Sequence, residues 1–159
     1  MIPSDSYGIT VNKSIKGEER FKIIIDAVVL QNDKFQLYFK DSFQNEFSPD
    51  KMIEASVTGG QKPQKIVYTF SPEVVPTQIR LDFGINYSQR PIKVNYILIR
   101  YGRKEFIFDK EKFAQLFKGN IFTEFIIESY EIRGKIIEDS YDPHFTSVDL
   151  DEIMFQLME

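Results

Sequence analysis

The densest group of chemistry-bearing residues in this chain of 159 lies in the stretch IRLDFGIN at 79–86. Its tripeptide Asp82-Phe83-Gly84 matches the sequence that holds a metal ion in protein kinases. Kinase chemistry also needs a glycine-rich phosphate loop, a strand lysine paired with a helix glutamate and a His-Arg-Asp loop, and the sequence contains none of them. We therefore interpret the match as coincidental and expect Arg80 and Asp82 to form a surface ion pair on one face of a strand.

Histidine, cysteine and the acidic residues add no catalytic pattern. His144 is the only histidine, no Gly-x-Ser-x-Gly elbow accompanies it, and we expect it in an exposed tail. The absence of cysteine excludes thiolate nucleophiles, disulfides and cysteine metal sites. No loop has the dense Asp and Asn spacing of a calcium loop. The sequence predicts no catalytic residue, no metal site and no cofactor, and therefore no enzyme.

Aromatic side chains offer a different chemistry, which is stacking against sugar rings with support from amide, carboxylate and guanidinium hydrogen bonds. The chain has eight tyrosines and no tryptophan. Tyr38 falls on the polar face of a strand and Tyr87 in a turn, so both are expected at the surface, with Tyr68 and Tyr96 as further candidates. Packing in the core or at its rim is the alternative interpretation for all four. The predicted ligand-binding residues are Tyr38, Arg80, Asn86 and Tyr87.

Length and composition indicate one compact domain. A hydrophobic content of 42%, with 14% aromatic residues, is enough to fill a core, and 159 residues fit the usual size of one domain. With 20 basic against 24 acidic residues the net charge is −4, which disfavours nucleic acid as a partner. We expect a flexible or partly ordered leader at 1–19 and a single domain at 20–159.

Strand-length segments joined by turn residues dominate the first two thirds of the domain. Gly, Pro and Asn separate them at short spacing, and no helical pattern intervenes, which favours an antiparallel sandwich over a parallel βαβ sheet. The expected strands are 21–30, 35–39, 52–57, 65–70, 79–83, 92–99 and 104–108.

Helices are expected only late in the chain. Asp109 can cap a short helix near 110–118 that Gly119 would end. The apolar segment 122–137 predicts one bulged strand or two short ones. An appended tail at 138–159 begins with a turn-rich stretch at 139–147 and ends in a helix over 149–158. The predicted fold is a mainly β, jelly-roll-like antiparallel β-sandwich with these two helices.

Several short motifs carry a resemblance to a known kind of module. In chain order they are DKFQLYF at 33–39, FS at 47–48, Gly59 with QKI at 64–66, and IRLDFG at 79–84. Together they resemble a β-sandwich module of bacterial cell-envelope proteins, found beside glycosyltransferase domains and in uncharacterised membrane-anchored proteins. The resemblance covers about 20–100 and ends after Gly102. It implies a jelly-roll-like sandwich and an envelope context, and it supplies no catalytic residue.

The expected function is that of a non-catalytic, extracytoplasmic interaction domain of a bacterial envelope protein, binding a protein or a glycan and tethered to the membrane in the full-length protein. The alternative is a carbohydrate-active enzyme accessory or hydrolytic domain, which needs a cleft with two carboxylates about 5–10 Å apart. A cytoplasmic fold of unrelated function also stays open, because the sequence shows neither a signal peptide nor a membrane-spanning run of ~20 apolar residues. The oligomeric state is not predicted.

Overall fold

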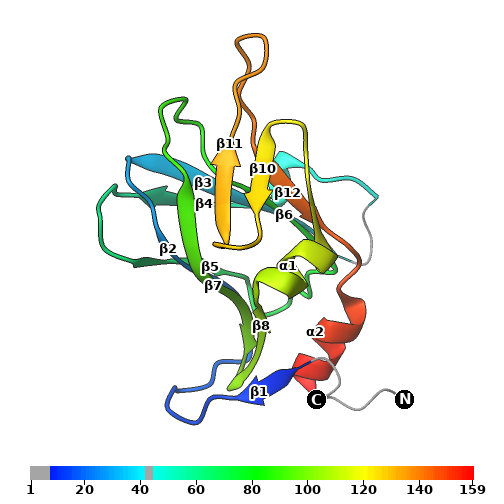
Figure 1. The fold of residues 1–159 in the computed structure, drawn as a ribbon. Coiled ribbons are helices and arrows are strands. Elements are labelled where there is room, and N and C mark those ends of the chain that lie inside the picture. Colours follow the sequence, from blue (N-terminus) through cyan, green and yellow to red (C-terminus); the bar gives the residue numbers. More distant parts are fainter. Residues whose placement is uncertain (1–7, 42–44) are drawn as a thin grey trace.

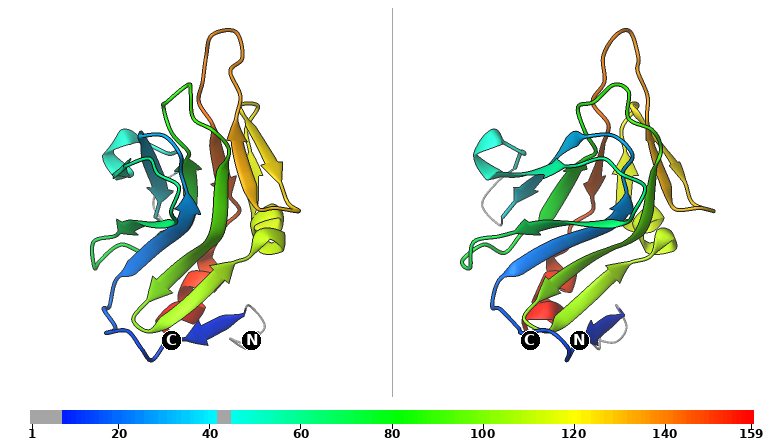
Figure 2. Two further views of the ribbon diagram at one scale, coloured as in Figure 1. Left: turned by 60° about the vertical axis from the view of Figure 1, so that its left-hand side comes forward. Right: turned by 90° about the vertical axis from the view of Figure 1, so that its left-hand side faces the viewer.

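The computed structural model describes residues 8–41 and 45–159, and it contains two antiparallel β-sheets packed face to face with two α-helices at their margins (Figures 1 and 2). This confirms the predicted mainly β sandwich. Residues 1–7 of the expected leader lie outside the described part of the chain, whereas residues 9–11 form a short strand.

The larger sheet, sheet A, is built around its longest strand. Strand β7 pairs with β2 along one edge, and with β8 and then β11 along the other. Strand β5 extends the sheet beyond β2, β1 extends it beyond β8, and β10 extends it beyond β11. The bounds of these strands are β1 Ile9–Val11, β2 Phe21–Val28, β5 Gln64–Thr69, β7 Ile92–Tyr101, β8 Lys104–Phe108, β10 Thr123–Ile126 and β11 Glu131–Gly134.

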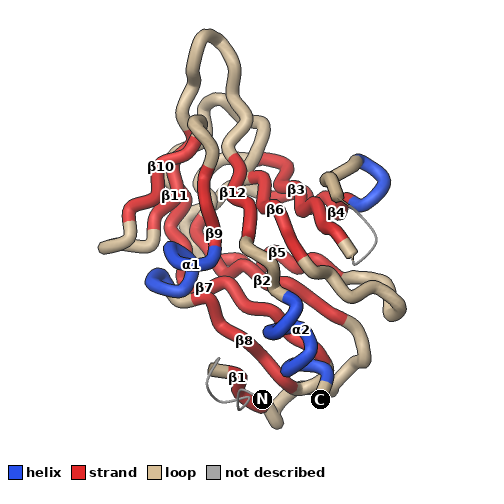
Figure 3. The backbone as a smooth tube through the Cα atoms, turned by 90° about the vertical axis from the view of Figure 1, so that its right-hand side faces the viewer, coloured by secondary structure: helices blue, strands red, loops and turns tan. Residues whose placement is uncertain are grey.

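The smaller sheet, sheet B, has the strand order β4-β3-β6-β12-β9 in the described residues. Its strands pair antiparallel throughout the described residues, and a short 3-10 turn at Pro49–Lys51 leads into β4. Figure 3 shows its strands beside helix α1, with α2 nearer the chain ends. The bounds are β3 Asp33–Lys40, β4 Met52–Val57, β6 Gln78–Asp82, β9 Phe117–Gly119 and β12 His144–Ser147.

The core lies between the two sheets and follows the alternation of the strands. Phe35 and Leu37 of β3 are fully buried, and Ile79 and Leu81 of β6 point the same way, as the sequence predicts. Helix α1 (Lys110–Leu116) is tied to this core by Phe113, and helix α2 (Asp151–Met158) buries its own apolar residues against it. Burial of this apolar surface is the main force that holds the sheets together.

Two local predictions need correction. Helix α1 ends at Leu116, and Gly119 belongs to strand β9, where an added Cβ would lie 2.1 Å from the Thr123 hydroxyl oxygen. The expected turn-rich stretch at 139–147 instead ends in strand β12, which pairs with β6 on one side and β9 on the other. Four residues are too few for a period-2 pattern to stand out in sequence, so the neighbouring strands decide this structure.

Candidate functional site

Polar side chains form a continuous row across the outer face of sheet B. The register places Gln36 of β3 between Glu54 of β4 and Asp82 of β6, and places His144 of β12 next to Asp82. Asn120, which follows β9, donates its backbone N–H to the carbonyl of His144. Neighbouring strands lie ~4.8 Å apart, so a row of this kind spans roughly 19 Å. We call this set the polar row: Glu54, Gln36, Asp82, His144 and Asn120.

Hydrogen bonds along the polar row hold its side chains in place. Gln36 Nε2 donates to Glu54 Oε2 at 3.0 Å, and the Tyr38 hydroxyl donates to Gln36 Oε1 at 3.3 Å. At the other end, Asn120 Oδ1 accepts from the backbone N–H of His144 at 3.3 Å. The side chains are therefore ordered before any ligand arrives, which lowers the entropy cost of binding.

Arg80 and Asp82 form a bidentate ion pair beside the row. Arg80 Nε and Nη2 each donate to a different oxygen of Asp82 at 2.7 Å, and the Arg80 guanidinium lies 4.5 Å from the centre of the Tyr38 ring. The predicted pairing is confirmed, but its predicted surface position is wrong, because Asp82 is only 8% exposed. Arg80, on the same strand, bonds both oxygens of this carboxylate.

Burial and the positive charge of Arg80 shift the pKa of Asp82 in opposite directions. Burial raises the pKa of Asp82 above its ordinary value, even though the hydrogen bonds and the charge of Arg80 lower it. The hydrogen bond to Asp82 raises the pKa of Arg80, so the guanidinium is held more firmly in its charged form. Burial disfavours the charged form of Asp82 more than that of Arg80, because the Asp82 side chain is 10% exposed and the Arg80 side chain is 23% exposed.

Two members of the polar row, Asp82 and His144, meet Asp142 of the loop before β12. Potential metal-binding atoms of Asp82, Asp142 and His144 lie within 4.8 Å of one another. Arg80 already bonds both oxygens of Asp82, and its positive charge opposes the approach of a cation. This arrangement favours hydrogen bonding to a polar ligand over metal ligation.

Asp33 fixes the loop that carries the other two predicted site residues. Its Oδ1 accepts from the backbone N–H groups of Ile85 (2.8 Å) and Asn86 (3.1 Å), and its Oδ2 accepts from Gln89 Nε2 (2.9 Å). Gly84 has a φ of +109°, and an added Cβ would lie 2.2 Å from Asp33 Oδ2. Glycine is needed here both for its backbone conformation and for the close approach of the carboxylate.

Asn86 and Tyr87 lie apart from Tyr38 and Arg80. The Asn86 amide donates to the carbonyl of Asn32 at 2.9 Å and accepts from the N–H of Ser88 at 2.9 Å, so it stabilises its own loop. Tyr87 is 53% exposed, and its ring lies 5.3 Å from that of Tyr141 in the loop that projects between β11 and β12 (Figure 1). The structure thus brings only two of the four predicted residues together.

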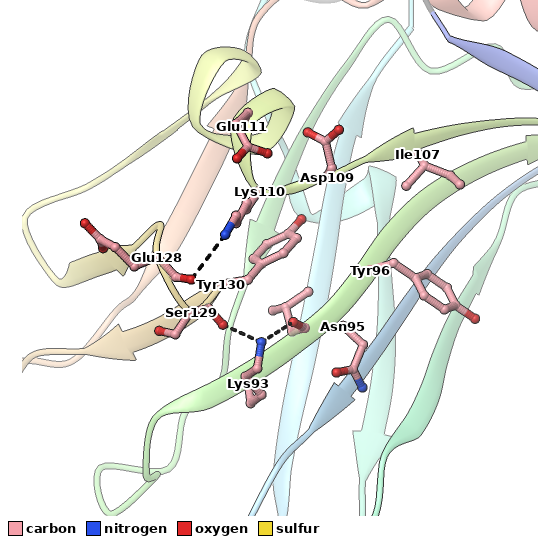
Figure 4. Close-up of a pocket in the computed structure, with 11 residues that line it drawn as sticks. Lys93, Asn95, Tyr96, Ile107, Asp109, Lys110, Glu111, Glu128, Ser129 and Tyr130 are labelled. Atoms are coloured by element: carbon pink, nitrogen blue, oxygen red, sulfur yellow. Dashed lines mark hydrogen bonds between the residues drawn. The ribbon is translucent and has the colours of Figure 1, made fainter.

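The remaining tyrosine candidates have different environments. Tyr68 is 1% exposed and belongs to the core, where burial raises its pKa far above the ordinary value, so it cannot be a binding platform. Tyr96 borders a hollow of about 390 Å³ between β7, the start of α1 and the turn at 128–130 (Figure 4). Tyr130, in the same hollow, was not predicted as a site residue, and its buried position carries no distinctive sequence signal.

Comparisons with known proteins do not extend this description. No protein family model, no curated protein and no solved structure matches the chain. In the described part of the chain, neither helix has the length and apolar character needed to cross a membrane. A proposal for the function of this chain therefore rests on the chemistry of its own surfaces.

Proposed function

We propose that this chain is a glycan-binding β-sandwich module that holds an extended saccharide along the polar row. The supporting observation is the alignment of five polar side chains, from four strands and the residue after the fifth, on one open sheet face. Saccharide hydroxyls both donate and accept hydrogen bonds. The row offers amides, carboxylates and an imidazole, which together supply both kinds of partner.

A glycan suits this face better than a protein partner does. The buried centre of a protein interface is usually rich in aromatic and apolar side chains. In residues 8–41 and 45–159, exposed large hydrophobic side chains such as Ile85 and Phe155 are not part of the polar row, and the one that directly adjoins it in sequence is Ile121, after Asn120. A surface that binds through polar groups alone matches the chemistry of a sugar chain.

Tyr38 and Arg80 extend the row on one side. Because the guanidinium lies over the Tyr38 ring, one face of this tyrosine is already covered, and the pair acts as a single flat surface. Asp82 uses two of the five N–H groups of Arg80, which leaves three donors on the guanidinium for further hydrogen bonds.

A hydrolytic function is the second candidate, because Asp82 and Asp142 approach each other. Glycoside hydrolysis requires one carboxyl that donates a proton and a second that attacks or activates water. Arg80 donates to both oxygens of Asp82, and these hydrogen bonds favour the charged carboxylate, which has no proton to deliver. Binding is therefore the better proposal. Hydrolysis would instead yield shortened saccharides, and their formation would stop in Asp82→Asn.

The proposed setting is extracytoplasmic, in the periplasm or at the cell surface of a bacterium, with the module tethered to the membrane in the full-length protein. The resemblance of residues 20–100 to envelope modules supports this setting. External protease added to spheroplasts, whose periplasmic and surface proteins are both accessible, should degrade a tagged full-length protein while a cytoplasmic marker survives. Protection equal to that of the marker would instead favour the cytoplasmic alternative.

Calorimetric titration with a panel of envelope saccharides tests the proposed function. We expect Gln36→Ala and His144→Ala each to weaken binding by at least about tenfold, since each removes hydrogen bonds from the row. Gln61→Ala, an exposed glutamine outside the row, is the matched control and should bind as the wild type does. The proposal fails if no saccharide binds, or if the row variants and the control bind equally.

A further inference from the structure

The hollow in Figure 4 is a second site, separate from the polar row. It is formed by β7 of sheet A, the start of α1 and the turn at 128–130, and it has a volume of about 390 Å³. This volume is within the range of about 300–1,000 Å³ that small-molecule sites occupy. A ligand here would not contact the residues on which the proposed function rests.

Tyr130 forms the floor of this hollow in a backbone conformation that is unusual for its residue type. Its φ is +53°, in the left-handed region that favours glycine and strains other residue types. Several contacts enforce it: the hydroxyl donates to the carbonyl of Phe108 at 2.7 Å, and the carbonyl accepts from the N–H of Val94 at 2.9 Å. Tyr130 directly follows the two residues whose carbonyls hold the lysines, Glu128 and Ser129.

These two lysines approach adjacent carbonyl oxygens from different elements. Lys110 Nζ, from α1, donates to the Glu128 carbonyl at 3.2 Å. Lys93 Nζ, from β7, donates to the carbonyls of Ser129 and Val94. An ammonium has three N–H donors, so two remain on Lys110 and one on Lys93 for a ligand.

Charges of both signs line the hollow without neutralising one another. Its acidic residues are Asp109, Glu111 and Glu128, and its basic residues are Lys93 and Lys110. Among the described residues, no ion pair joins any of these five to an opposite charge. Figure 4 places Asp109, Lys110 and Glu111 on one side of the Tyr130 ring and Lys93 on the other, so charged groups of both signs surround the hollow.

We propose that this hollow binds a small zwitterion of the amino-acid or dipeptide class. The carboxylate of the ligand is held by Lys93 and Lys110, and its ammonium by Asp109 and Glu111. Ile107 and Tyr96 lie at one side of the hollow, where they provide an apolar surface for a ligand side chain. Charge complementarity of this kind gives specificity more than affinity.

Other ligand classes fit these charges less well. A nucleotide brings several negative charges, and the three carboxylates would repel it. A divalent cation would be repelled by two ammonium groups. A zwitterion is the class that satisfies both sets of charges together.

Nuclear magnetic resonance titration of the ¹⁵N-labelled chain tests the proposal. The probes are the twenty amino acids and the dipeptide leucyl-glycine. Each is added to about 10 mM, which is ten times the weakest Kd of interest, about 1 mM. Two blocked dipeptides, N-acetyl-leucyl-glycine and leucyl-glycinamide, each lack one of the charges. We expect the amides of Tyr96, Ser129 and Tyr130 to shift with a free zwitterion, and each blocked form to bind at least about tenfold more weakly.

Variants separate the two halves of the site. Lys110→Met should abolish the preference for a free carboxylate, and Glu111→Gln should reduce the preference for a free ammonium. Among the described residues the Glu111 side chain makes no hydrogen bond or ion pair, so its variant should leave the fold and the rest of the spectrum unchanged. Lys62→Met, an exposed lysine elsewhere, is the control. Absence of shifts with every free probe, or equal binding of the blocked forms, would overturn the proposal.

Discussion

At the scale of single residues, the carboxylates of Asp33 and Asp82 have different roles, although each residue is only 8% exposed. Asp33 accepts hydrogen bonds from loop N–H groups, and it therefore fixes the chain after β6. Asp82 is bonded by Arg80 and lies within the polar row. The first residue determines where a loop lies, and the second fixes the Arg80 side chain on the outer face of sheet B.

Gly84→Ala should destabilise the protein, because alanine would adopt a φ of +109° and its Cβ would press on the Asp33 carboxylate. We expect the free energy of unfolding to fall by about 2 kcal/mol or more. Urea denaturation should show a lower midpoint with an unchanged slope. Gly60→Ala is the matched control, because no atom lies within 4 Å of its added Cβ. Equal midpoints for the two variants would contradict this role of Gly84.

Arg80→Gln should raise the pKa of Asp82 further, since burial already raises it and Arg80 is what lowers it. A folded-state pKa above the ordinary 3.8 means that the folded protein binds this proton more tightly than the unfolded chain does. The contribution of Asp82 to stability therefore decreases as pH rises from 3.8 through the folded pKa, and is regained on acidification. Titration of the carboxyl carbon resonances of both proteins measures the shift. A lower pKa in the variant would contradict the role of Arg80 in lowering the pKa of Asp82.

At the scale of elements, the sequence predicts what local periodicity encodes. The alternation in β3 and β6 correctly assigns Leu37 and Leu81 to the core and Tyr38 and Arg80 to the outer face. Strands β9 and β12 are three and four residues long, and such short segments carry no usable pattern. The polar row could not be predicted for a related reason. Its members come from five separate segments, and only the pairing register aligns them.

Helix α1 depends on one aromatic side chain for its attachment to the sandwich. Phe113 is fully buried, stacks on Phe117 with ring centres 4.7 Å apart, and also contacts Phe125 and Phe145. Phe113→Ala should cost about 3–5 kcal/mol of unfolding free energy, because it leaves a cavity between the sheets. Phe155→Ala on α2 removes an equal volume from a side chain that is 56% exposed, and should be close to neutral. Similar thermal midpoints for both variants would contradict this role.

At the scale of the whole molecule, the two proposed sites use different parts of the sandwich. Regular strands of sheet B build the polar row, and their pairing fixes the spacing of its side chains. The hollow is formed where β7, α1 and a strained turn meet, so its shape depends on Tyr130 and its neighbours. An extended ligand suits the first geometry, and a small compact ligand suits the second.

The width of sheet B predicts how saccharide affinity depends on chain length. If the ligand lies along the polar row, each added sugar contacts another strand, and affinity should rise until the saccharide covers roughly 19 Å and then level off. Calorimetry with a ladder of oligosaccharides of one repeating sugar measures this directly. Glu54→Ala and Asn120→Ala, at opposite ends of the row, should weaken binding of the longest members more than that of the shortest. Glu73→Ala, exposed and outside the row, should change neither. An affinity that is already maximal for a monosaccharide would mean that the ligand occupies a single point, and that the alignment of the strands serves the fold alone.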